Sequence, residues 1–329
     1  MKIAPGIRLN FNTNSVGVSF GPRGAKYTIN SSGRHTVSAG IPGSGLYVSE
    51  SKGGGKRRSR STEPELIPDS SSPGFFSPGS ERAFYNFAKI YLSEDSGYTF
   101  EEVKAEAERL KTEHPKIASY IDFVMIAPTT NQSTEEALAL CESLYKNNPD
   151  FLQHPIATKY FDEFTAKIPI ARGITYTTDY NNNFLSYSYS EILQAVGQTE
   201  KALEVIQKVK DSEFKDLAIT DLHLALKRYQ EVIAETDDVE NVDDISALLL
   251  VFRGIAMREL GDYDIALETF KQAISKRSRE EAIRHFALYE RACTYHLMGK
   301  TALAIKDLNK ILAADYSNEA AREKLKEIS

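Results

Sequence analysis

The chain of 329 residues contains no tryptophan and two cysteines, Cys141 and Cys293. The cysteines lie about 150 residues apart, which excludes a disulfide scaffold and a metal site built from closely spaced cysteine pairs. No apolar run reaches the roughly 18 residues that a membrane-spanning helix needs, and the N-terminus has no apolar block of the secretory type. We therefore expect a cytoplasmic protein with two free thiols and no membrane span.

Acidic residues are scarce at the N-terminal end. Residues 1–62 hold ten lysines and arginines but a single acid, Glu50, although the whole chain has Lys+Arg 40 and Asp+Glu 46. The first 62 residues thus carry a net charge of +9 and the remainder −15, and the overall value of −6 describes neither part. Such an asymmetry indicates two separate modules.

Common enzyme signatures are also missing. The sequence has no HExxH, no GxSxG and no GxxxxGK[ST], and the run Gly53–Lys56 is followed by Arg57 in place of the hydroxyl that would hold Mg²⁺. The six histidines show no paired metal-ligand spacing. We therefore expect a protein that is not an enzyme, with no catalytic residues, no cofactor and no metal.

The first fifty residues alternate apolar and polar side chains. Runs such as Ile7–Phe11 and Val16–Phe20 have the period of half-buried strands, and short clusters of turn-forming residues separate them. This pattern predicts a small antiparallel β-meander over residues 1–50. Its core is thin, so we expect it to lean on another part of the protein or on another copy.

The same segment carries the marks of a known family. These are the motif G-x-R-x-N from Gly6, S-x-G-V-S-x-G-P-R-G-A from Ser15, S-G-R-x-T from Ser32 and G-x-P-G-S-G-L-Y from Gly40. In these positions the segment resembles the bacterial domain-of-unknown-function family 4236. The resemblance implies a bacterial origin and a small β module joined to other segments, and it supplies no activity.

Residues 51–80 change abruptly in composition. Serine, glycine and proline fill 17 of these 30 positions, and a basic run extends from Lys56 to Arg60. So polar a stretch buries too little apolar surface to offset the conformational entropy that the chain would lose on folding. It is therefore predicted to be a disordered basic linker. Two adjacent aromatic residues, Phe75 and Phe76, are either a docking anchor or the first contact with the next domain. The linker could also fold back on the acidic helical part.

Beyond Ser80 the apolar period becomes helical. Thr99–Glu102 and Ser133–Glu136 both fit the capping box that begins a helix. Among the helices expected here is a single long one over residues 217–236. Residues 168–180, rich in alternating β-branched side chains, form the one segment that favours extended structure.

Three helical stretches repeat one pattern. Gly197, Gly261 and Gly299 are each followed five residues later by alanine and nine residues later by a large apolar residue. The pattern resembles the tetratricopeptide repeat, a helix–turn–helix unit, and an irregular helical bundle is the alternative. The best copies begin near residues 247 and 285, with a degenerate one at 183–216. The resemblance assigns repeat-structural roles to Gly254, Gly261, Tyr263, Ala266, Phe270, Ala273, Gly299 and Ala304.

In that family the first helix of each repeat lines a concave binding groove. Carried over by position, the groove residues are Leu248, Val251, Ile255, Arg258, Phe286, Tyr289, Cys293 and His296. No amine or amide occupies the positions of the family's carboxylate clamp, so an amphipathic or helical partner segment is expected. Packing against an adjoining helix is the alternative for each of these side chains.

The basic N-terminal end supports a rival function. Its cations could contact phosphates while neighbouring aromatic residues stack on bases, although those aromatics fall on core positions of the strands. The anion-binding candidates are Arg8, Arg23, Lys26, Arg34, Lys56, Arg57, Arg58 and Arg60.

Together these patterns predict an α+β multidomain protein. Its parts are a small β domain (1–50), a disordered basic linker (51–80), a helical region with degenerate repeats (81–182) and an all-α, tetratricopeptide-like solenoid (183–327). The expected function is that of a protein–protein interaction adaptor; the alternative is a protein that binds nucleic acid or an anionic surface. Self-association is left open.

Overall fold

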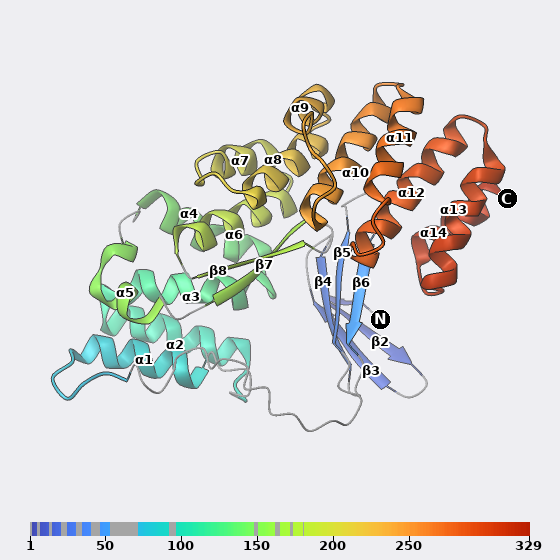
Figure 1. Ribbon diagram of the computed structural model, residues 1–329. Coiled ribbons are helices and arrows are strands. Elements are labelled where there is room, and N and C mark those ends of the chain that lie inside the picture. The colour runs from blue at the N-terminus through green and yellow to red at the C-terminus, as the bar shows by residue number, and fades with distance from the viewer. Residues whose placement is uncertain are drawn as a thin grey trace. The chain divides into compact units, whose positions relative to one another are not determined.

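Figure 1 shows the computed structural model of the protein. In its first 71 residues the structure describes the backbone of six strands, and beyond them it describes most of the chain. The described strands and ranges are residues 2–4, 7–12, 15–20, 25–30, 35–40, 47–52, 72–91, 97–147, 151–161, 165–171, 174–179 and 181–329.

The N-terminal strands form antiparallel pairs. Strand β2 pairs with β1 and with β3, and β5 pairs with β4 and with β6. Their side chains lie outside the described residues, so the small β domain over 1–50 and the linker over 51–80 stay predictions. The strands are β1 (Lys2–Ala4), β2 (Ile7–Asn12), β3 (Ser15–Phe20), β4 (Ala25–Asn30), β5 (His35–Gly40) and β6 (Tyr47–Lys52).

The described helices fall into two compact units, which divide at residues 198 and 199. The helices of the first unit are α1 (Gly79–Tyr91), α2 (Phe100–Glu113), α3 (Ala118–Thr130), α4 (Thr134–Asn147), α5 (Pro155–Phe161) and α6 (Asn182–Ala195), with short 3-10 turns at Pro115–Ile117 and Phe151–Gln153. The capping box predicted at Thr99 is confirmed, because Thr99 and Glu102 bond reciprocally at the start of α2.

Aromatic side chains form the core of the first unit. The ring of Phe84 in α1 lies 5.9 Å from Tyr160 and 5.7 Å from Phe161, both in α5. Phe123 of α3 lies 5.2 Å from Phe161 and 5.3 Å from Phe184 of α6. Edge-to-face contacts of this kind add to the burial of large rings, so these four helices form one packed body.

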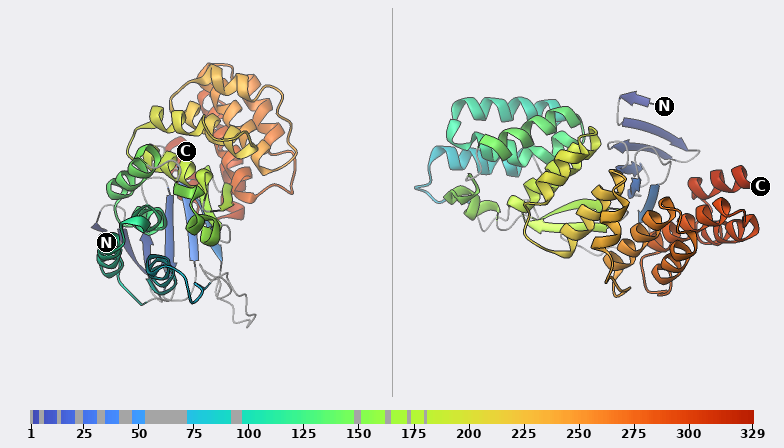
Figure 2. Two further views of the ribbon diagram at one scale, coloured as in Figure 1. Left: turned by 90° about the vertical axis from the view of Figure 1, so that its left-hand side faces the viewer. Right: turned by 90° about the horizontal axis from the view of Figure 1, so that it is seen from above.

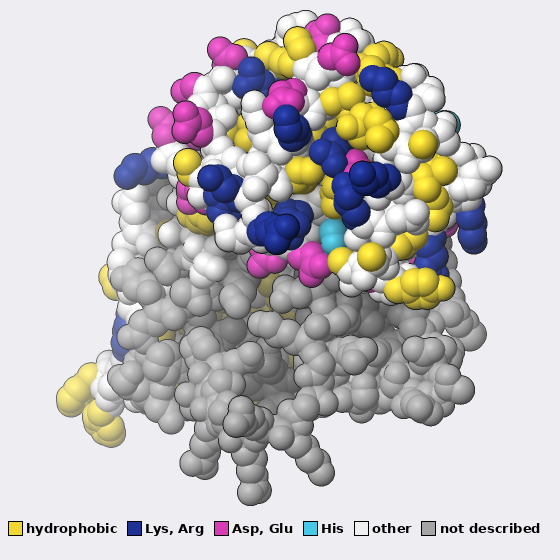
Figure 3. Space-filling view, turned by 45° about the vertical axis from the view of Figure 1, so that its right-hand side comes forward, with side chains coloured by type: hydrophobic (Ala, Val, Ile, Leu, Met, Phe, Trp, Pro, Cys, Tyr) yellow, Lys and Arg dark blue, Asp and Glu magenta, His cyan; other side chains and the backbone are white. Residues whose placement is uncertain are grey.

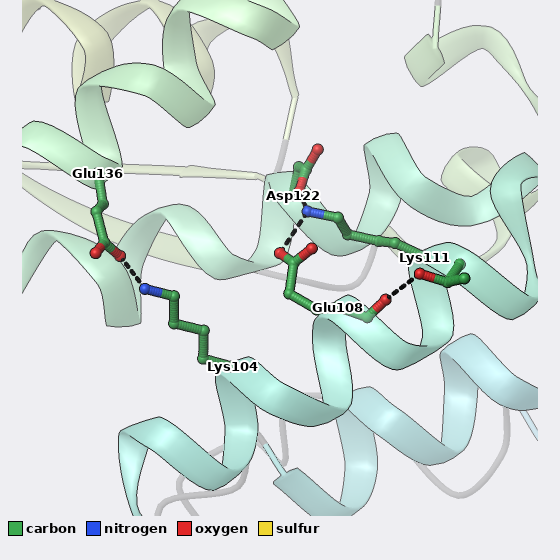
Figure 4. A network of polar contacts seen from close by, with 6 residues as sticks. Lys104, Glu108, Lys111, Asp122 and Glu136 are labelled. Atoms are coloured by element: carbon green, nitrogen blue, oxygen red, sulfur yellow. Dashed lines mark hydrogen bonds and ion pairs between the residues drawn. The ribbon is translucent and has the colours of Figure 1, made fainter.

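Ion pairs bind α2 to its neighbours across the surface of this unit (Figure 4). Lys104 donates to Glu136 of α4 at 2.5 Å, and Lys111 donates to Asp122 of α3 at 2.8 Å. Ser133, the second predicted cap, accepts from the backbone N–H of Glu136 at 3.2 Å. The carboxylate of Glu136 therefore pairs with Lys104 and connects α4 to α2.

Strands β7 (Thr165–Ala171) and β8 (Ile174–Asp179) form a two-stranded sheet. They lie in the region where the alternating side chains of residues 168–180 favour extended structure. Figure 1 labels both strands, and Figure 2 shows them from two further sides.

The second unit contains the remaining helices, among which α8 and α9, α10 and α11, and α12 and α13 are joined by tight turns. They are α7 (Thr199–Ile206), α8 (Glu213–Ala225), α9 (Tyr229–Glu235), α10 (Asp244–Glu259), α11 (Tyr263–Ala273), α12 (Glu281–Leu297), α13 (Thr301–Ala314) and α14 (Glu319–Ile328).

One turn geometry recurs between paired helices. Gly197, Lys227, Gly261 and Gly299 have positive φ of 81°, 58°, 92° and 72°. After each of them, the next N–H donates to the carbonyl five residues earlier, as in Asp262 to Met257 at 2.9 Å. This is the Schellman motif, which satisfies the last carbonyls of a helix. The recurrence shows that the helical pairs are built alike.

The prediction of a single helix over residues 217–236 is wrong. The structure ends α8 at Ala225 and begins α9 at Tyr229, with Lys227 in the left-handed turn. Lysine adopts this conformation at a cost of about 1–2 kcal/mol, so nothing in the local sequence signals the break. The α8–α9 pair is therefore a further helical hairpin.

The repeat-structural residues divide between turn and interior: Gly261 and Gly299 lie exposed in the turns, and Tyr263 is partly buried. Ala266, Phe270, Ala273 and Ala304 are all buried. A Cβ atom built on Gly254 would lie 2.6 Å from the Phe270 ring, so α10 and α11 approach each other more closely than any side chain at 254 allows.

Candidate functional site

Helix α12 presents three of the predicted groove residues on one face. Tyr289, Cys293 and His296 follow at intervals of four and three residues, which places them on one side of a helix. All three are partly buried, and the next residue, Leu297, is 59% exposed. We call the surface formed by Arg258, Tyr289, Cys293, His296 and Leu297 the α10–α12 face.

The guanidinium of Arg258 is already neutralised inside the protein. It donates to the carboxylate of Glu290 at 2.6 Å and to that of Glu259 at 3.0 Å. Burial alone would lower the pKa of Arg258, but the charges of these two carboxylates outweigh it and raise it. Arg258 therefore joins α10 to α12 and is no free cation for a ligand.

Burial keeps the thiol of Cys293 and the hydroxyl of Tyr289 in their neutral, protonated forms. It raises the pKa of Cys293 to about 12, and the nearby charge of Glu290 acts in the same direction. Burial likewise raises the pKa of the Tyr289 hydroxyl, which lies within hydrogen-bond reach of Cys293. A thiol with so high a pKa holds little thiolate at neutral pH, so it is a poor nucleophile.

Helix α14 borders the same face. The charge of Glu327 acts on Tyr289 and that of Lys324 on Cys293, and Lys324 and Glu327 pair with each other at 2.7 Å. The described charges around the face thus neutralise one another, and its surface offers aromatic, imidazole and aliphatic groups.

Four other predicted groove residues lie in the core instead. Leu248 and Val251 are fully buried, and Phe286 and Ile255 are nearly so. Helix α10 packs against α8, α9, α11 and α12, and these contacts surround it with other helices. Because a buried side chain cannot meet a partner, we leave these four out of the α10–α12 face.

Glu290, Lys324 and Glu327 also belong to the surroundings of this face, and the sequence did not predict them. Glu290 is a buried acid whose partner stands 32 residues earlier in the chain. The only available signal was a glutamate in a helical segment that is otherwise apolar on that side. Nothing in the local pattern of α14 places Lys324 and Glu327 next to α12.

The remaining predicted residues lie elsewhere. The anion-binding candidates Arg8, Arg23, Lys26, Arg34, Lys56, Arg57, Arg58 and Arg60 have side chains outside the described residues. Within the part of the chain that is described, no cluster of three His, Cys, Asp or Glu side chains could hold a metal ion. Among the described helices, none combines the length and apolarity needed to span a bilayer.

Comparisons with known proteins concern the sequence of the N-terminal segment and the fold of the chain. Residues 1–49 match the model of a family described as a protein of unknown function, DUF4236, which confirms the predicted N-terminal resemblance. No curated protein matches the chain.

Among solved structures, the chain is similar in fold to the N-terminal domain of the EccA1 ATPase from the ESX-1 secretion system of Mycobacterium tuberculosis. The TM-score is 0.56 at 14% sequence identity, and the match covers 76% of this chain and 89% of that one. The chain therefore joins a segment that matches the DUF4236 model to helices that are similar in fold to a domain of a secretion-system ATPase.

Proposed function

We propose that the protein is a non-enzymatic adaptor that binds a segment of a partner protein at the α10–α12 face. The recurring helical hairpins support this function, since stacked hairpins present side chains of successive first helices side by side. The similar fold of the EccA1 domain is consistent with a helical-repeat scaffold.

The neutralised charge of Arg258 carries the proposal furthest. With its guanidinium held by Glu290 and Glu259, the face offers Tyr289, His296 and Leu297 as its contact groups. Such a surface favours an apolar or amphipathic helical segment over an acidic peptide, because an acid would find no unpaired cation there.

Differential capture tests the proposal. The full chain, the variant Leu297→Glu and the control Val242→Glu are immobilised and exposed to a lysate of the source cells. Val242 is an exposed aliphatic residue before α10, so both variants add one negative charge at an exposed aliphatic position. We expect the same proteins on wild type and control, and the loss of at least one from Leu297→Glu. Identical protein sets on all three baits would contradict the proposal.

A second candidate function rests on the charge of residues 1–62. Ten cations against one acid favour contact with nucleic acid or an anionic surface. Filter binding of the full chain to duplex DNA at low and high salt tests it: binding that weakens with salt supports the candidate, and no binding at low salt removes it.

A further inference from the structure

Two neighbouring hairpin tips carry opposite charges at equivalent positions. Asp262 directly follows the turn glycine Gly261, and Lys300 directly follows Gly299. Each is the N-cap residue of the second helix of its hairpin, and neither makes a side-chain capping hydrogen bond. Because successive helices run antiparallel and α10 contacts α12, both tips lie at the same edge of the second unit.

Each tip also carries exposed aliphatic side chains. Leu260 is 40% and Ile265 53% exposed beside the acidic residue, and Leu303 is 43% exposed beside the basic one. Ile265 and Leu303 again occupy equivalent positions, four residues after their glycines. We call Leu260, Asp262, Ile265, Lys300 and Leu303 the tip surface. Figure 3 shows one side of the molecule, where hydrophobic side chains lie among both kinds of charge over the described helices.

The preceding hairpin, α8–α9, carries Arg228 at the equivalent position, and this charge is paired within the chain. Arg228 follows the turn residue Lys227 and donates twice to Glu200 of α7, at 2.8 and 2.9 Å. By contrast, neither Asp262 nor Lys300 forms a side-chain hydrogen bond or ion pair with any residue that the structure describes. Opposite charges on adjacent tips are thus present but do not meet within one chain.

We propose that the tip surface is a two-fold interface with a second copy of this chain. A two-fold axis between the tips brings Asp262 of each copy to Lys300 of the other, so the same pair forms twice. It also brings the exposed aliphatic residues of one copy against those of the other, which removes apolar area from water. This surface shares no residue with the α10–α12 face, and the proposal goes beyond the adaptor function.

Charge exchange at the equivalent positions tests the interface on the full chain. Sedimentation velocity and light scattering are measured for wild type, Asp262→Lys, Lys300→Asp, the double variant and an equimolar mixture of the two single variants. We expect a wild-type dimer that weakens at high salt, and at least about tenfold weaker self-association of each single variant, because like charges then face each other twice. The double variant regains the dimer.

The mixture gives the decisive result. When one copy carries Asp262→Lys and the other Lys300→Asp, both cross-pairs are again attractive, so a heterodimer forms although neither variant associates alone. Circular dichroism confirms that every variant keeps its helices. Wild type that stays monomeric at all concentrations, single variants that dimerise as wild type does, or a mixture that stays monomeric would each overturn the proposal.

Discussion

At the scale of single residues, small side chains decide where helices come together. Gly254 and the alanines at 266 and 304 leave the space in which the second helix of a hairpin packs against the first. The sequence predicts these positions because the small residues recur at fixed distances from the turns. Their neighbours cannot be read in the same way: Glu290 stabilises Arg258 from another helix, and local spacing carries no trace of that contact.

Replacing Gly254 with alanine tests the close approach. The new Cβ would lie 2.6 Å from the fully buried ring of Phe270, so the ring or the helices would have to shift. We expect Gly254→Ala to lower the free energy of unfolding by about 1–3 kcal/mol, measured by urea denaturation. Gly79→Ala is the control, since no atom lies within 4 Å of its Cβ. Equal stability of the two variants would contradict the close packing of α10 and α11.

The thiol of Cys293 gives a pH-dependent prediction. Burial and Glu290 raise its pKa to about 12, whereas an unfolded thiol has a pKa of about 8.5. The raised pKa stabilises the fold below the unfolded pKa, and this contribution is lost as the pH rises toward the folded value.

We expect the rate of Cys293 alkylation by iodoacetamide, followed by peptide mass spectrometry, to keep rising from pH 8 to pH 10 in the folded protein. In the denaturant-unfolded control it should level off above about pH 9. A plateau near pH 8 in the folded state would show that Cys293 is not in a neutral, buried environment.

At the scale of helices and turns, glycine made part of the fold predictable. The turns at Gly197, Gly261 and Gly299 follow from their sequence signature, and each has the expected left-handed conformation. The turn at Lys227 has the same geometry without the glycine, which is why residues 217–236 were predicted as one helix. There the packing of α8 and α9 overrides the local preference of lysine.

Substitutions at two turns measure the free-energy cost of the left-handed conformation for a residue other than glycine. We expect Lys227→Gly to raise the free energy of unfolding by about 1 kcal/mol, because glycine adopts positive φ without the steric cost that lysine bears. Gly261→Ala, at a φ of 92°, should lower it by a similar or larger amount. Thermal unfolding of both variants beside wild type provides the measurement. Destabilisation by Lys227→Gly would contradict the left-handed turn between α8 and α9.

The pair of Arg258 and Glu290 connects α10 to α12. Arg258→Met leaves the buried carboxylate of Glu290 without its guanidinium, and we expect a loss of about 3–5 kcal/mol of stability in urea denaturation. The double variant Arg258→Met, Glu290→Leu removes both charges and should recover most of that loss. If the double variant is as unstable as the single one, the ion pair is not the reason for the effect.

At the scale of the whole molecule, composition predicts a division between a basic N-terminal segment and an acidic helical remainder. The charge of +9 on residues 1–62 belongs to a segment whose first 49 residues match DUF4236. The helices beyond it fall into two units, and the hairpins of the second carry both surfaces for which we propose partners. The adaptor function depends on one of them, the α10–α12 face.

Site-specific photo-crosslinking tests that function most directly. A benzophenone amino acid replaces Leu297 on the face or, as the control, Tyr316 in the loop before α14; these side chains are 59% and 79% exposed. After irradiation in source-cell lysate, we predict crosslinks from position 297 to a segment of a partner protein and none to that partner from position 316. Equal crosslinking from both positions, or none from position 297, would contradict the account.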